Sequence, residues 1–192
     1  MRPTSIVAIA ALAFLSAFAA CGGGVSSEAD AKKAYMGLDT SVDKAIQLGF
    51  DGYNANPNGA NILPQSADGG VSGTMTVTGQ VDQGASNNKG MRLNDALSGY
   101  SDDGQVKYST DQSSVPALVI NLKNIPSGTV DGSLNGPFMM SGGLSGQVSL
   151  SLTFSGQTEA GPGNTVVRKA GTTHITGTAT SPAGTYNVDV TR

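Results

Sequence analysis

Hydrophobic residues recur every three or four positions in the first part of the chain after residue 26. The residues that share this spacing are Tyr35, Leu38, Val42, Ala45, Ile46 and Gly49. This spacing places side chains on one stripe of an α-helix. Ser27 suits the N-cap position, and acidic residues follow it, where the helix dipole favours negative charge. The pattern predicts one amphipathic helix over residues 27–49, with charged side chains such as Asp39 and Lys44 on its solvated face.

The periodicity changes after a predicted loop over residues 51–70, which is rich in Asn, Pro and Gly. Apolar residues then alternate with Ser, Thr, Gln, Asn or Asp in residues 74–78, 147–154 and 186–191. Alternation with a period of two gives a strand one buried face and one wet face. Strands of this kind are typical of an antiparallel sheet.

Two turns share the form Pro-small-Gly-Thr and begin at Pro126 and Pro182. Proline followed by glycine predicts three-residue turns with a bulge. The predicted strand pairs are 118–122 with 130–138 and 174–179 with 186–190. The fold class is therefore mostly β (α+β): one N-terminal helix, then an antiparallel meander of about seven to nine strands, folded as a sandwich or an open barrel.

Composition fits one domain, over residues 27–192, in a chain of 192 residues. The 11 Lys and Arg residues include Arg2, which leaves 10 against 14 Asp and Glu in the rest of the chain. This balance, without a basic patch, lacks the electrostatic footprint of a nucleic-acid binder. The chain has no Trp, and its other aromatic residues are scattered, which gives no support to an aromatic platform for sugars or bases.

The first twenty residues differ from the rest. Arg2 precedes an apolar run over residues 6–15, which is shorter than the roughly 20 residues that span a bilayer but fits the core of a secretory signal. The segment Phe18-Ala19-Ala20-Cys21 then resembles the lipobox of bacterial lipoproteins, with Phe18 where Leu is usual. The resemblance implies a signal peptide over residues 1–20, cleavage before Cys21, and diacylglycerol on the Cys21 thiol.

Ordinary secretion is the alternative, because Ala17-Phe18-Ala19 also fits a small-x-small cleavage site. Cys21 is the single cysteine, so an internal disulfide is excluded. Residues 21–26 form a predicted Gly-rich tether. Anchoring takes about two acyl chains, which diacylglycerol supplies. Gly22, where Asp would signal retention in the inner membrane, implies by the same resemblance an outer-membrane lipoprotein.

His174 is the single histidine, and the predicted hairpin places it near Asp189, where a carboxylate could orient a catalytic base. No Gly-x-Ser-x-Gly nucleophile motif accompanies it, so we interpret it as a solvated strand residue.

Two further groups carry oxygen ligands. Asn54, Asn56 and Asn58 have the spacing of a calcium loop, but neutral amides attract a cation weakly. Asp102, Asp103 and the nearby Asp95 are expected to form a small acidic patch at a solvated turn. We therefore predict no metal, no cofactor and no catalytic residues.

The leading hypothesis is a lipid-anchored envelope protein whose exported domain is structural or binds partners. A carrier or chaperone of an apolar ligand such as a lipid is the alternative, and an exported enzyme is third. The predicted partners are the membrane, through the anchor on Cys21, and a protein or apolar ligand of unknown identity.

Overall fold

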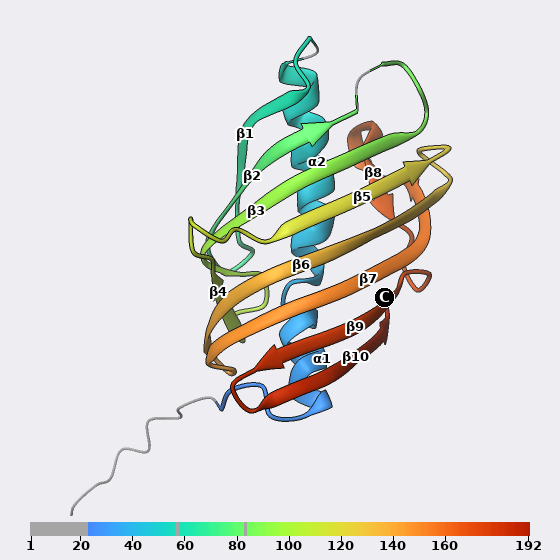
Figure 1. The fold of residues 1–192 in the computed structure, drawn as a ribbon. Helices are drawn as coiled ribbons and strands as arrows, with labels where there is room; N and C mark the ends of the chain where they lie inside the picture. Colours follow the sequence, from blue (N-terminus) through green and yellow to red (C-terminus); the bar gives the residue numbers. More distant parts are fainter. Residues whose placement is uncertain (1–22, 57, 83) are drawn as a thin grey trace, which may run out of the picture.

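The computed structural model describes residues 23–56, 58–82 and 84–192, and combines a helical layer with a large β-sheet (Figure 1). The predicted signal peptide and Cys21 lie outside the described residues. The elements in chain order are α1 (Glu28–Met36), α2 (Asp39–Ala55), β1 (Asn61–Asp68), β2 (Ser72–Val81), β3 (Lys89–Ser101), β4 (Val106–Ser109), β5 (Ala117–Lys123), β6 (Thr129–Gly142), β7 (Gly146–Ala160), the 3-10 helix η1 (Pro162–Asn164), β8 (Val166–Arg168), β9 (His174–Ser181) and β10 (Gly184–Thr191).

The first helix begins where the sequence predicts. Ser27 is the N-cap, and its hydroxyl accepts a hydrogen bond from the Asp30 amide at 3.1 Å. The helix does not run on unbroken, because the chain turns at Gly37 and Leu38. The Tyr108 hydroxyl donates to the Ala34 carbonyl at 2.8 Å, an acceptor that a continuous helix would give to the Leu38 amide. Leu38 instead donates to the Tyr35 carbonyl.

The prediction of one amphipathic helix over residues 27–49 is therefore wrong in three respects. Two helices are present, and α2 continues to Ala55, so residues 51–55 belong to a helix and not to a loop. Burial extends beyond one apolar stripe, since Asp39 and Ser41 are buried with Val42 and Ile46. The predicted loop over residues 51–70 is also interrupted by β1.

The sheet is antiparallel throughout, and its strands follow the order β1-β2-β3-β4-β6-β7-β9-β10, with β5 between β3 and β6 and β8 beside β7. The described residues form ten strands, where about seven to nine were expected. The helices cross the strands on one face of the curved sheet (Figure 1). Helix α1 packs on β9 and β10, and α2 packs on β1, β2, β3 and β8. The structure thus has one sheet covered by a helical layer, and not the expected sandwich or open barrel. Strands β1 and β10 are the two ends of the strand order.

The two predicted strand pairs are confirmed, although the partners of residues 118–122 end at Leu134 and do not reach Phe138. Leu122 pairs with Val130 across β5 and β6, and Ala179 pairs with Tyr186 across β9 and β10. Both predicted three-residue turns are wrong, because Ser181 pairs with Gly184 and leaves two residues in that turn, while Lys123 pairs with Thr129 and leaves five. Gly184 has a φ of 145°, which glycine tolerates and other residues rarely adopt.

The core lies between the helices and the inward face of the sheet. Tyr35, Tyr100, Tyr108 and Phe138 are among its largest fully buried side chains. Tyr108 and Phe138 meet edge to face, with ring centroids 6.4 Å apart, a geometry that aromatic quadrupoles favour. In the described part of the chain, no helix has the length and apolar character needed to cross a membrane.

Candidate functional site

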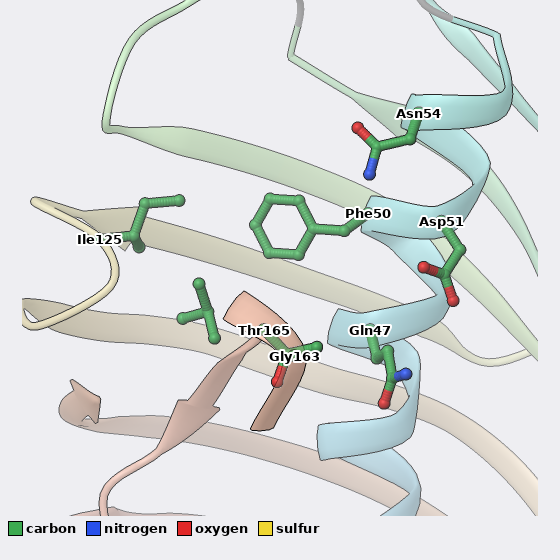
Figure 2. Close-up of a pocket in the computed structure, with 8 residues that line it drawn as sticks. Gln47, Phe50, Asp51, Asn54, Ile125, Gly163 and Thr165 are labelled. Carbon is green, nitrogen blue, oxygen red and sulfur yellow. The ribbon is translucent and has the colours of Figure 1, made fainter. Parts of the chain in front are cut away.

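A cavity of about 250 Å³ lies between α2, the end of β5 and the segment from η1 to β8 (Figure 2). Four of its residues come from one face of α2, because they are spaced by three and four: Gln47, Phe50, Asp51 and Asn54. The other walls are Ile125, Gly163, Thr165 and Val166. Figure 2 shows the Phe50 ring projecting from α2 toward Ile125.

The lining of this α2–β8 cavity is mixed. Phe50, Ile125 and Val166 give it an apolar part, while Gln47 and Asp51 offer amide and carboxylate groups. Ligand sites commonly combine apolar walls with a few polar groups, in volumes of roughly 300–1,000 Å³. The cavity is slightly smaller than that range and fits a small molecule better than a long acyl chain.

The strongest electrostatic cluster joins β8 and the residue after β10 to the start of α2. Arg168, whose side chain is 5% exposed, donates from Nε to Asp43 Oδ1 at 2.7 Å and from Nη1 to Asp39 Oδ1 at 3.0 Å. The Tyr35 hydroxyl also donates to Asp39 Oδ1, at 2.6 Å, and Arg192 Nε lies 3.1 Å from Asp39 Oδ2. Both carboxylate oxygens of Asp39 are thus hydrogen-bonded, so the Arg168 cluster ties three elements together.

Protonation in the Arg168 cluster follows from these contacts. Burial alone would raise the pKa of the Asp39 carboxyl, but the charge of Arg168 and the hydrogen bond from Tyr35 hold that pKa below its usual value. Burial and the neighbouring Asp39 charge raise the pKa of the Tyr35 hydroxyl. Asp39 is therefore ionised and Tyr35 neutral near pH 7. The prediction that Asp39 lies on a solvated face is wrong, because Arg168 supplies the buried partner that the carboxylate needs.

His174 Nε2 lies 2.9 Å from Asp189 Oδ1, as the predicted hairpin requires. Strand pairing also places Ser155 of β7 opposite His174, a neighbour that sequence reasoning missed because it depends on the order of β7 and β9. The His174 and Asp189 side chains are 53% and 70% exposed, and no hydrogen bond joins Ser155 to His174 among the described residues. The pair lies on the exposed face of the β9–β10 hairpin.

The prediction that Asp95 belongs to a solvated acidic patch is wrong. Alternation along β3 directs Leu93, Asp95 and Leu97 inward, and Asp95 is 1% exposed. Its Oδ1 atom has no hydrogen-bond partner among the described residues. Burial raises the pKa of Asp95 to about 7.

Asp102 also faces internal partners. Its Oδ1 accepts from Lys44 Nζ at 2.6 Å, and its Oδ2 accepts from the Tyr100 hydroxyl at 2.6 Å. Burial favours a higher pKa, but these hydrogen bonds hold the pKa of Asp102 below its usual value. Asp103 is the exposed member of the group, and its Oδ1 accepts from the Gln105 amide. The three acids therefore lie in three separate environments.

The asparagines of the suggested calcium loop are also separated in structure. Asn54 belongs to α2 and faces the α2–β8 cavity. Asn56 is the C-cap of that helix, and its side-chain amide donates to the Asn61 carbonyl at 3.1 Å. Asn58 lies in the exposed turn before β1. No group of three His, Cys, Asp or Glu side chains suited to a metal ion occurs within residues 23–192, leaving aside the two positions not described.

Comparison of the chain with protein-family models, with curated proteins and with solved structures gave no match. The geometry and the sequence therefore carry the functional argument.

Proposed function

We propose that this chain is a lipid-anchored protein of a bacterial cell envelope, and that its exported domain acts by binding and not by catalysis. The observation that carries the proposal is the segment Phe18-Ala19-Ala20-Cys21, which follows a short apolar run and contains the single cysteine. A diacylglyceryl group on Cys21 supplies the two acyl chains that stable membrane attachment takes. Gly22 after Cys21 favours the outer membrane.

The internal polar contacts support a binding or structural role. The charges of Arg168 and Asp39 bind one another, as do those of Lys44 and Asp102. These groups hold helices to the sheet, which is a structural use of charge. Under this proposal His174→Gln leaves the envelope phenotype of the protein unchanged, as measured by complementation of a deletion strain.

Intact mass of the protein extracted from its native membrane tests the anchor. We expect a chain that begins at Cys21 and carries the mass of two or three acyl chains. Cys21→Ala should move the protein to the soluble fraction, while the matched variant Ser26→Ala should stay in the membrane. An unmodified chain that begins at Ala20 would overturn the proposal and would indicate ordinary secretion.

A carrier of a small apolar ligand is the second candidate, and the α2–β8 cavity favours it. The helices fill the concave face of the sheet (Figure 1), where a sheet curved around a lipid would hold its cargo. The α2–β8 cavity beside Phe50 is a candidate site, and its volume of about 250 Å³ suits a small ligand. Protein purified without detergent exchange should then release such a molecule on denaturation, and Phe50→Asp should remove it. Leu63→Asp, at an exposed position, is the matched control and should retain the ligand. Wild-type protein that releases no ligand on denaturation would exclude this candidate.

A further inference from the structure

The described chain begins in firm contact with one end of the sheet. The Ser145 amide, in the turn between β6 and β7, donates to the Gly23 carbonyl at 3.1 Å. Ser181, beside the turn between β9 and β10, donates from its hydroxyl to the Val25 carbonyl at 2.6 Å. Val25 itself is fully buried. The predicted tether is thus fixed to the domain from Gly23 onward.

The position of Gly23 limits how far the domain can lie from an anchor on Cys21. Only Gly22 separates the two residues, and an extended chain spans at most about 3.3–3.6 Å per residue. The Cα atom of Cys21 therefore lies within about 7 Å of that of Gly23. The headgroup layer on each side of a bilayer is about 5–8 Å thick. Acyl chains on Cys21 would bring this end of the sheet into contact with the headgroups.

The surface around Gly23 is suited to that contact. We define the tether-end surface as Gly23, the β6–β7 turn at residues 142–146 and the β9–β10 turn at residues 182–184, which lie at the same end of the sheet (Figure 1). None of these residues carries a charge, and the ammonium group beside them, that of the exposed Lys33 next to Gly143, can stay in contact with water or headgroup phosphates. Met139, at its rim, is 50% exposed.

Both ends of the sheet carry exposed charges. Asp82, Lys123, Glu159 and Lys169 end or follow strands at the end opposite Gly23, while Asp68, Asp103 and Lys107 lie at strand ends on the Gly23 side. The short connection to Cys21, and not a difference in charge between the two ends, therefore carries the orientation.

We propose that the tether-end surface rests on the lipid bilayer, with the strands running away from the membrane and the opposite end of the sheet directed outward. This inference rests on the proposed anchor at Cys21. It adds a defined contact surface and a defined orientation, because Gly23 and Val25 leave the anchor only a short connection. The α2–β8 cavity, which includes Ile125 from the far end of β5, then lies away from the bilayer.

Fluorescence quenching on the full lipidated chain tests the orientation. Ala183→Cys places a thiol on the tether-end surface, and Ala170→Cys is the matched exposed control at the opposite end. Each variant is labelled with an environment-sensitive fluorophore and reconstituted into vesicles of phosphatidylethanolamine and phosphatidylglycerol with nitroxide headgroups. We expect several-fold stronger quenching at position 183 than at position 170. Equal quenching at the two positions would overturn the orientation.

A longer connection provides the second arm. Inserting about 12 Gly and Ser residues between Gly22 and Gly23 adds a span of about 17–21 Å, and should reduce quenching at position 183 to the level at position 170. Unchanged quenching would show that the short connection does not set the orientation. Failure of the anchor itself is distinguished by flotation and labelling: a chain without lipid stays with the soluble fraction, and its Cys21 thiol takes a second fluorophore.

Discussion

At the scale of single residues, the Asp95 carboxyl lies in an environment that disfavours its charge. Its folded pKa is raised to about 7 by burial, whereas an Asp carboxyl in an unfolded chain titrates near about 3.9. Between about pH 4 and 7 the folded state thus binds a proton that the unfolded state lacks. The contribution of Asp95 to the free energy of unfolding is therefore fully present below about pH 4 and is lost as the pH rises through about 7.

Asp95→Asn should remove this pH dependence. The gain in free energy of unfolding relative to wild type should be larger at pH 8 than at pH 4.5 by a few kcal/mol, at about 1.4 kcal/mol per pH unit. Urea unfolding at the two pH values measures the gain. Any fixed cost of burying the amide cancels in this comparison, and the exposed Asp103→Asn is the control. Equal effects of Asp95→Asn at both pH values would contradict the prediction.

The same residue shows how far sequence reasoning reaches at this scale. The alternation of Leu93, Asp95 and Leu97 along one strand directs all three to the same face, but the chemistry of a carboxylate predicts the opposite face. Packing determines the direction of the Asp95 side chain, since β3 lies between β2 and β5 with its inward face under α2. The contact of His174 with Asp189 was predictable because one short hairpin sets it. Its neighbour Ser155 was not, because that contact needs the order of distant strands.

At the scale of elements, Arg168 holds β8 to α2. Arg168→Gln would leave the buried Asp39 carboxylate without its main partner, and we expect a loss of about 3–5 kcal/mol in the free energy of unfolding. Lys169→Gln, at the exposed neighbour, should change it by less than about 0.5 kcal/mol. Because Arg168 helps to lower the pKa of Asp39, this stabilisation is present above the unfolded pKa and is lost as the pH falls through the folded one. The difference between Arg168→Gln and wild type should accordingly shrink in urea titrations near pH 3, and a constant difference would contradict the ion-pair explanation.

The length of α2 shows why element boundaries are harder to predict than element types. The predicted helix ends at Gly49, because the apolar spacing stops there and a segment rich in Asn, Pro and Gly follows. In the structure both Gly49 and Gly52 lie inside α2, where the helix approaches the sheet closely. A Cβ atom on Gly52 would lie 2.8 Å from Ile62 Cβ. The glycines thus mark a contact with β1 and β3, which no local pattern reveals.

Gly52→Ala tests that explanation through the sign of its effect. Alanine in a helix interior normally stabilises by about 0.5–1 kcal/mol over glycine. Here the contact with Ile62 should reverse the sign and lower the free energy of unfolding by about 1–3 kcal/mol. Gln47→Ala, at an exposed position of the same helix, is the control, with an expected change within about 0.5 kcal/mol. Thermal and urea unfolding measure both variants, and a stabilised Gly52→Ala would show that β1 can move away.

At the scale of the whole molecule, the path of the chain explains the architecture. The helices run from the β10 side of the sheet to the β1 side, and the strands then return in sequence order (Figure 1). Sequence periodicity indicated a helix followed by an antiparallel meander, and the two Pro-Gly turns indicated which neighbouring strands pair. The layer arrangement could not be predicted, because it depends on which element covers the inward face of the sheet. That choice is made by long-range contacts such as the one between Tyr108 and Ala34.

An open sheet leaves two edges that could pair with another chain, a hazard that a closed barrel avoids. The β1 edge carries Pro64 and a change of register between Ile62 and Gln65, two features that oppose further strand pairing. At the β10 edge, the Glu28 carboxylate accepts a hydrogen bond from the Asn187 amide at 3.2 Å, which places a charge beside that strand. Both edges are therefore protected, by different means.

Pro64→Thr should weaken the protection of the β1 edge. The substitution restores a backbone N–H and places a β-branched residue beside Leu63, which is 52% exposed. Sedimentation velocity over a range of concentrations should show more self-association than wild type, while circular dichroism stays unchanged. Pro182→Thr restores an N–H in a two-residue turn, away from a free edge, and should sediment as wild type does. If Pro64→Thr also matches wild type, the changed register between Ile62 and Gln65 protects the edge without help from the proline, and a variant that regularises the register becomes the discriminating experiment.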